Sequence, residues 1–281
     1  MSLRQLIPLI LLSLGTATAA AGGQPLVPDS TDSTAATAAT YRPVDHEWLM
    51  GIGRANVLDT YLSRLEYTGT SLSVTHTTLR PTRRRGDRLT RQTLLTAHVA
   101  AVHSPTDDYD AYDADLWAAM AWHWRVLAHN GLALYAGGMA EAGTGFTYNE
   151  MGGNNPAQGR LTADAALTLR ATYAFRCLRR PMALALQTDI PVAGVMFAPH
   201  YGQSYYEIFA LGQTDRNVRL TTPFSAPSLR LLGTLHIPLG RATLSVGYRA
   251  DVRQSDTGGL KRHLWNNQLV VGYVHRVYLA R

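Results

Sequence analysis

The 281-residue sequence contains one cysteine and, after its first residues, no long apolar run. With Cys177 alone, an internal disulfide framework and a cysteine-based metal site are both excluded. No later segment approaches the ~18 consecutive apolar residues of a membrane helix. If this chain spans a membrane, it must therefore do so with β-strands.

A secretory signal peptide is predicted at residues 1–19. Arg4 supplies its positive region, Leu6 to Leu14 its apolar core, and Ala17-Thr18-Ala19 a small-residue cleavage site. An apolar run of roughly nine residues is too short for a transmembrane anchor. Residues 20–45 follow and are rich in Ser, Thr, Ala and Pro, with too few large apolar residues for a core. We expect them to form a flexible leader before a folded domain at residues 46–281.

Two distant stretches alternate between apolar and polar residues. From Ala242 to Arg253 the even positions are apolar, and from Leu161 to Phe175 the odd positions are apolar. A period of two places alternate side chains on opposite faces of a strand. An apolar face about ten residues long is what a tilted strand presents to lipid. The pattern predicts an all-β fold, a transmembrane antiparallel up-and-down β-barrel.

About ten segments have this character, and 8–12 strands are compatible with the pattern. An even number suits a closed bacterial barrel made of one chain. The segments are Glu47–Asn56, Gly69–Arg80, Leu89–His103, Ala114–Ala128, Leu132–Tyr148, Leu161–Arg176, Met182–Ile190, Ser228–Ile237, Ala242–Gln254 and Leu264–His275.

The connections between these segments alternate in length. Four are short, at residues 81–88, 129–131, 177–181 and 238–241, whereas those at 57–68, 104–113, 149–160 and 191–227 are longer; the short connection at 255–260 is the exception in the second set. Short periplasmic turns and long extracellular loops are typical of outer-membrane barrels, so we expect the last strand to end in the periplasm. A soluble periplasmic barrel with its apolar residues inside is the alternative.

The signal peptide and the barrel pattern together place the protein in the outer membrane of a Gram-negative bacterium. Aromatic side chains near strand ends should lie at the lipid–water boundary. These are Trp117, Tyr173, Phe175, Tyr248 and Tyr273. The net charge of +6 suits anionic neighbours, and no nucleic-acid-binding module is visible. Outer-membrane lipid and phosphorylated glycolipid are therefore the expected partners, with no nucleic acid.

Several segments resemble an uncharacterised family of Bacteroidetes outer-membrane β-barrel proteins, a domain of unknown function. The segments that carry the resemblance are residues 56–69, 154–157, 195–209, 226–230 and 249–255. The similarity covers about residues 45–281 and implies an outer-membrane barrel. It brings no established activity, so no functional residue can be transferred.

Charged side chains fall on the predicted inward face. A ten-stranded barrel is narrow, so these groups can meet across the lumen and neutralise one another. We favour a charged plug, and a narrow anion-preferring channel is the alternative. Arg249 and Asp251 share a face two residues apart, so each should find its partner on another strand. The predicted network comprises Glu141, Asp164, Arg170, Asp189, Arg230, Arg249, Asp251 and Arg253.

The connection at residues 191–227 is far longer than ordinary loops and has a core-like composition. We expect it to fold as a lid over the extracellular mouth. Its packing anchors should be Phe197, Tyr201, Tyr205, Tyr206 and Phe209.

The same connection contains His200, Ser204 and Glu207, the residue types of a hydrolytic triad. A triad is defined by hydrogen-bond geometry rather than by nearness in sequence, and no Gly-x-Ser-x-Gly elbow is present. We favour a structural or binding role over catalysis. An outer-membrane hydrolase of lipids or esters that uses these rim residues is the alternative.

An acidic segment is predicted to form an external loop. It contains Asp107, Asp108, Asp110, Asp113 and Asp115. The spacing does not match a calcium-binding loop, because no glycine or terminal glutamate follows at the required positions. The sequence therefore predicts neither a metal nor a cofactor, and it does not identify a ligand.

Overall fold

The computed structural model describes residues 41–82, 88–153, 155–240 and 242–280. The predicted signal peptide and residues 20–40 of the predicted leader lie outside the described residues. Strand β1 begins at Tyr41, so the barrel starts within the segment that was expected to be leader.

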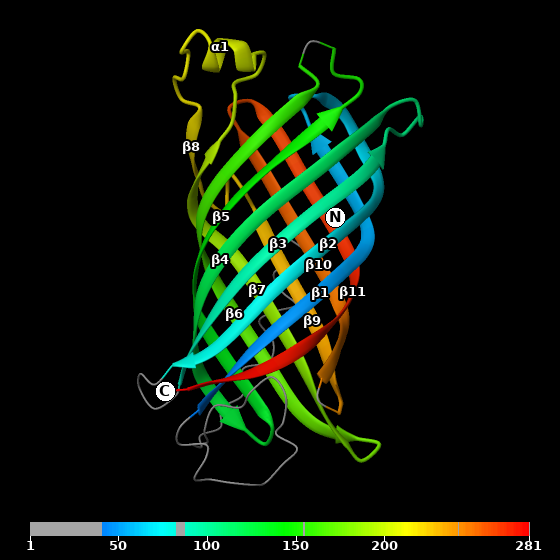
Figure 1. Cartoon of the computed structure of the whole chain (residues 1–281). Coiled ribbons are helices and arrows are strands. Elements are labelled where there is room, and N and C mark those ends of the chain that lie inside the picture. The colour runs from blue at the N-terminus through cyan, green and yellow to red at the C-terminus, as the bar shows by residue number, and fades with distance from the viewer. Residues whose placement is uncertain (1–40, 83–87, 154, 241, 281) are drawn as a thin grey trace.

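Ten strands form the wall of a closed antiparallel barrel, as the sequence predicts (Figure 1). Around the wall their order is β6-β5-β4-β3-β2-β1-β11-β10-β9-β7, and pairing of β6 with β7 closes the ring. The strands are β1 (Tyr41–Asp59), β2 (Ser63–Thr82), β3 (Leu89–His103), β4 (Asp110–His129), β5 (Leu132–Asn149), β6 (Ala157–Cys177), β7 (Arg180–Phe197), β9 (Ser228–Leu239), β10 (Ala242–Thr257) and β11 (Leu260–Ala280).

The barrel turns apolar side chains outward and polar side chains inward. On β6, Leu167 and Leu169 are exposed, whereas Thr168 and Arg170, which alternate with them, are buried. The same alternation runs along β10, where Val246 is exposed and Ser245 is completely buried. This arrangement excludes the soluble alternative, which requires apolar residues inside.

Helices contribute little to the described structure. No helix among the described residues is long and apolar enough to cross a membrane.

The two ends of the barrel differ. One end, here called the turn end, carries two-residue connections at 130–131 and 178–179; at Leu178 and Arg179 both backbone φ angles are positive. Two consecutive positive φ angles are typical of the two-residue turns that join antiparallel strands. The opposite end, here called the loop end, stands at the top of Figure 1 and carries longer connections at residues 104–109, 150–156 and 198–227, besides short ones at 60–62 and 258–259.

The long connection is partly strand. Strand β7 continues to Phe197 and pairs with β6, so residues 191–197 belong to the wall rather than to a loop. Beyond Phe197 come α1 (Tyr205–Phe209) and β8 (Val218–Thr221). Strand β9 pairs with β7 only up to Asp189, and β8 takes over as the partner of β7 from Gly194.

Candidate functional site in the barrel lumen

Polar side chains from opposite walls meet inside the barrel. Strands β4 and β10 stand five positions apart in the ring of ten, and Arg253 Nη1 of β10 lies 3.5 Å from Asp115 Oδ2 of β4. Strands β3 and β7 stand four positions apart, and Gln92 Nε2 donates to Gln187 Oε1 at 3.0 Å. Both contacts therefore join strands that face each other across the lumen.

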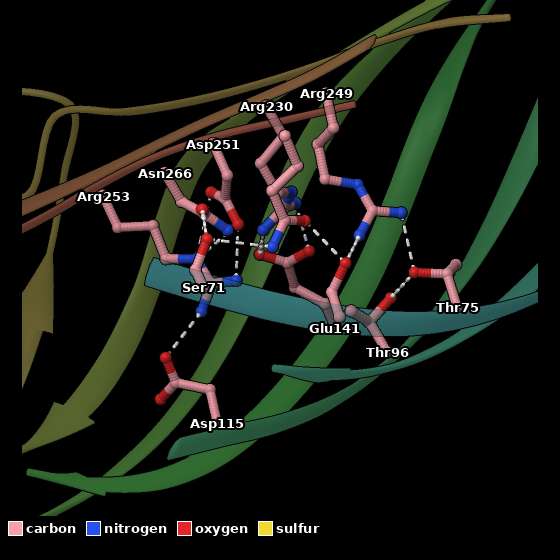
Figure 2. Close-up of polar contacts among 12 residues, drawn as sticks. Ser71, Thr75, Thr96, Asp115, Glu141, Arg230, Arg249, Asp251, Arg253 and Asn266 are labelled. Atoms are coloured by element: carbon pink, nitrogen blue, oxygen red, sulfur yellow. Dashed lines mark hydrogen bonds and ion pairs between the residues drawn. The ribbon is translucent and has the colours of Figure 1, made fainter. Parts of the chain in front are cut away.

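Two members of the predicted network pair across the lumen. Both terminal nitrogens of Arg230 on β9 donate to the carboxylate of Glu141 on β5, with an Nη1–Oε1 distance of 2.9 Å. The Arg230 guanidinium also lies 4.8 Å from the centre of the Trp117 ring. Figure 2 shows Arg230 reaching towards Glu141, Arg253 towards Asp115 and Arg249 towards Thr75.

Asp251 and Arg249 use different kinds of partner. Asp251 accepts from Arg253 on its own strand, at 2.6 Å from Nη2, so the expected partner from another strand is wrong for this residue. The long Arg253 side chain thus contacts Asp251 along the wall and Asp115 across the lumen. Arg249 does find its partners on another strand, but they are the hydroxyl groups of Ser73 and Thr75, at 3.0 and 2.7 Å.

The other predicted charges are held by neutral groups. Asp164 accepts from the Thr221 hydroxyl at 3.1 Å, and Asp189 accepts from the Thr168 hydroxyl at 2.6 Å. The Arg170 guanidinium lies 5.8 Å from the centre of the Tyr135 ring. The structure thus places all eight predicted residues on inward positions but brings them into several separate groups.

Two aspartates of the predicted acidic loop are instead part of the lumen. Strand β4 begins at Asp110, and Asp113 and Asp115 point inward near the loop end. Arg160 Nη2 lies 2.9 Å from Asp113 and 2.8 Å from Asp115, and Arg262 Nη2 lies 3.3 Å from Asp113. The prediction of an external acidic loop is therefore wrong for these two residues. Tyr112, Ala114 and Leu116 alternate with the two aspartates, and this alternation indicates a strand.

A second polar group missed from the sequence lies near the turn end. Ser245 Oγ donates to Glu47 Oε1 at 2.8 Å and is 3.0 Å from His236 Nδ1. Arg276 Nε donates to Asp45 Oδ1 at 2.7 Å. The lumen is thus occupied by hydrogen-bonded side chains at several levels along its length.

One of the predicted boundary aromatics points into the lumen. Trp117 lies on the same face as Asp115 and contacts Arg230. Tyr173, Tyr248 and Tyr273 do face outward and are about half exposed. Trp117 fell on the wrong side in the prediction because Ala118 and Ala119 leave the phase of β4 ambiguous.

Cavities remain between the lumen side chains of the described residues, and two of them adjoin Trp117. The larger, about 110 Å³, lies towards the loop end and is lined by Trp117, Arg160, Met196 and Arg262 among others. The smaller, about 40 Å³, is lined by His98, Thr96 and Asp189 among others. A water molecule needs about 10–15 Å³ of such space, so the larger cavity has room for several waters or a small ligand.

The three triad-type residues of the long connection do not form a triad. Ser204 is the N-cap of α1, and its hydroxyl lies 3.0 Å from Glu207 Oε2 in a capping box. Hydrogen bonds from the Ser204 backbone and side chain lower the pKa of Glu207. The His200 ring contacts other residues instead. Its Nε2 lies 2.8 Å from the Asp215 carbonyl oxygen, and its Nδ1 lies 3.0 Å from Arg219 Nη2.

The predicted anchors of the long connection divide into two sets. Phe209 stacks on both Phe197 and Tyr205, with ring centres 6.3 and 6.1 Å away. Tyr201 and Tyr206 are 64% and 68% exposed and have no ring contact of this kind with the described residues, and Phe209 is itself 73% exposed, so these three anchors bury little surface.

Comparison with known proteins gives a family but no activity. The profile of a family described as "Protein of unknown function (DUF3316)" matches residues 6–281. A search of curated proteins found no match. Among solved structures, the outer-membrane protease OmpT of Escherichia coli is 8% identical, with 84% of this chain and 97% of that chain covered and a TM-score of 0.49.

Two further structures are similar at lower TM-scores. An outer-membrane channel of Pseudomonas putida F1 is 11% identical, with 85% of this chain and 96% of that chain covered and a TM-score of 0.38. The translocator domain of the autotransporter NalP of Neisseria meningitidis is 10% identical, with 83% and 88% covered and a TM-score of 0.37.

Proposed function

The chain belongs to the DUF3316 family of proteins of unknown function, and we propose that it is an outer-membrane β-barrel of a Gram-negative bacterium with a closed lumen. In this proposal the barrel does not conduct ions. It serves as a structural or binding protein, and residues 198–227 form a folded lid over its loop end.

The outer surface supports insertion into a membrane. Apolar side chains face outward all around the wall, including Met50 and Ile52 on β1 and Leu269 on β11, each at least 60% exposed. Exposed apolar surface of this extent is unfavourable in water and favourable in lipid. Towards the loop end the outward positions carry polar residues, and Arg54 of β1 is an example. Polar outward residues are expected where a strand leaves the hydrocarbon layer.

The contact between Arg253 and Asp115 carries the proposal of a closed lumen. It joins opposite walls of the barrel, and the Arg230–Glu141 pair lies beside it. A conducting pore needs an open path lined by hydrated groups, whereas these side chains bond to one another.

The charge inside the barrel does not favour the alternative of an anion channel. An anion-preferring pore needs an excess of arginine or lysine. Among the described residues the inward carboxylates and guanidinium groups are nearly equal in number. The carboxylates are those of Asp45, Glu47, Asp59, Asp113, Asp115, Glu141, Asp164, Asp189 and Asp251, and the guanidinium groups those of Arg125, Arg160, Arg170, Arg230, Arg249, Arg253, Arg262 and Arg276.

The contacts of residues 198–227 support the role of a lid. The Tyr61 hydroxyl, in the β1–β2 hairpin, donates to the Gln203 carbonyl at 2.8 Å. Strand β1 stands four positions from β7 in the ring, so this bond bridges the mouth of the barrel. Burial raises the pKa of Tyr61 to about 12, which keeps its hydroxyl protonated as a donor at neutral pH.

Planar-bilayer recordings test the closed lumen. The parent barrel should show no stable conductance, whereas a barrel with both Arg230→Ala and Arg253→Ala should conduct, because both cross-lumen contacts are removed. Arg54→Ala is the matched control, since Arg54 is an exposed arginine on the outer face. A parent protein that conducts as well as the double variant would refute the proposal.

A further inference from the structure

His98 is a buried histidine without a hydrogen-bond partner. Its side chain points from β3 into the barrel. The residue is 3% exposed, and neither ring nitrogen has a hydrogen-bond partner among the described residues. The other two buried lumen histidines differ, because His123 Nε2 lies 2.7 Å from Gln92 and His236 Nδ1 lies 3.0 Å from Ser245. An imidazole buried without any partner is costly, so its two free nitrogens need an explanation.

Two carboxylates face this imidazole. His98 lies directly opposite Asp115 in the antiparallel pairing of β3 with β4, and Asp113 follows on the same face of β4. One ligand atom from each of the three residues lies within 4.8 Å of the other two. Ligand atoms that each lie about 2.1 Å from one ion are about 3–4 Å apart. Small side-chain rotations would therefore bring all three onto a common ion.

The arginines around the group leave one oxygen of each carboxylate available. Arg160 Nη2 contacts Asp113 Oδ2 and Asp115 Oδ1, and Arg262 Nη2 contacts Asp113 Oδ2. Asp113 Oδ1 has no partner, and Asp115 Oδ2 has only the 3.5 Å contact with Arg253. Hydrogen bonds to the far oxygen of a carboxylate orient it as a metal ligand.

The local charge also favours a cation. Arg160, Arg253 and Arg262 are surrounded by Asp113, Asp115, Asp251 and Asp59, the last of which interacts electrostatically with Arg160 and Arg262. Four carboxylates and three guanidinium groups leave a net charge of −1. An uncharged imidazole adds a ligand without adding charge.

We propose that His98, Asp113 and Asp115 bind a divalent transition-metal ion of the Zn²⁺ class inside the barrel. One imidazole and two carboxylates are ligands that Zn²⁺ accepts, and the imidazole favours such an ion over Ca²⁺ or Mg²⁺. Asp115 lines the larger cavity and His98 the smaller one, so both cavities adjoin the site and can hold water ligands. The calcium-loop pattern could not find this site, because its ligands come from two paired strands.

The experiment uses the folded barrel in detergent micelles, with Co²⁺ as a visible probe for Zn²⁺. The parent should bind one Co²⁺ with d–d absorption and release it to Zn²⁺. His98→Asn and Asp113→Asn should each weaken this binding by at least about tenfold. His123→Asn is the matched control, since His123 is an equally buried lumen histidine outside the group. Heat-modified gel mobility checks that each variant is folded.

X-ray absorption at the Zn²⁺ edge of the parent protein provides a measurement that needs no variant. One imidazole and several oxygen ligands are expected. A coordination shell with two imidazoles would instead indicate the His46–His76 pair on the outer surface, whose ring nitrogens lie 3.3 Å apart, and would overturn the proposal. Absence of Co²⁺ binding to the parent, or unchanged binding by folded His98→Asn, would overturn it as well.

Discussion

Individual arginines in the lumen differ in what their loss would leave behind. Removing Arg230 leaves the Glu141 carboxylate buried without its guanidinium partner, whereas removing Arg249 leaves two neutral hydroxyl groups. A buried charge without a partner is costly, whereas hydroxyl groups can rotate to other acceptors or to water. The two arginines therefore allow a direct comparison of a charged and a neutral contact.

We predict that Arg230→Ala lowers the free energy of unfolding by about 3–5 kcal/mol. Arg249→Ala should lower it by about 1–3 kcal/mol. Urea unfolding in micelles, followed by tryptophan fluorescence, measures both. Adding Glu141→Ala to Arg230→Ala should recover part of the loss, because the unpaired carboxylate is then removed as well. Equal losses for the two arginines, with no recovery in the double variant, would contradict a special role for the ion pair.

At the scale of elements, the sequence predicted the ten strands but not their ends. The alternation persists only where the outward residues face lipid, and it disappears where a strand continues into water. On β2 the outward Arg64, Glu66 and Thr68 are polar, so this extension falls in the predicted loop at residues 57–68. The lumen contacts also depend on which strands face each other across the barrel, and one sequence does not give that.

The short helix α1 depends on its cap. Five residues cannot hold a helix alone, so the capping box of Ser204 and Glu207 is the main local support. We predict that Ser204→Ala costs about 1 kcal/mol within the loop and leaves the barrel stability unchanged. Hydrogen exchange should be faster in residues 204–213 and unchanged in the strands. Loss of an ester- or lipid-hydrolysing activity in folded Ser204→Ala would instead support the enzyme alternative.

The same cap should respond to pH. Hydrogen bonds from Ser204 lower the pKa of Glu207, so the stabilisation is present above the ordinary glutamate range. It is lost as the pH falls through the lowered pKa. Hydrogen exchange within α1, corrected for the intrinsic rate, should therefore increase on acidification below about pH 4. Glu207→Gln, which keeps an acceptor but cannot titrate, should show no such increase.

At the scale of the whole molecule, the ends of the barrel predict its orientation in the membrane. The turn end carries both described chain ends and two-residue connections such as 178–179, and the loop end carries the longest connection, with α1 and β8 (Figure 1). Barrels of this kind place short turns in the periplasm and long loops outside the cell. Cys177 is an exposed free cysteine at the turn end, so the natural chain already contains a probe for that side.

We predict that Cys177 does not react with an impermeant thiol reagent on intact cells and does react once the outer membrane is permeabilised. Asp108→Cys, made together with Cys177→Ser, should react on intact cells, because Asp108 is exposed in the β3–β4 connection at the loop end. Gly258 and Gly240 are poorer positions for a probe, because each has a φ of +65° that a cysteine would strain. Labelling of Cys177 but not of Asp108→Cys on intact cells would reverse the orientation. The lid would then face the periplasm, where it could not meet an extracellular ligand.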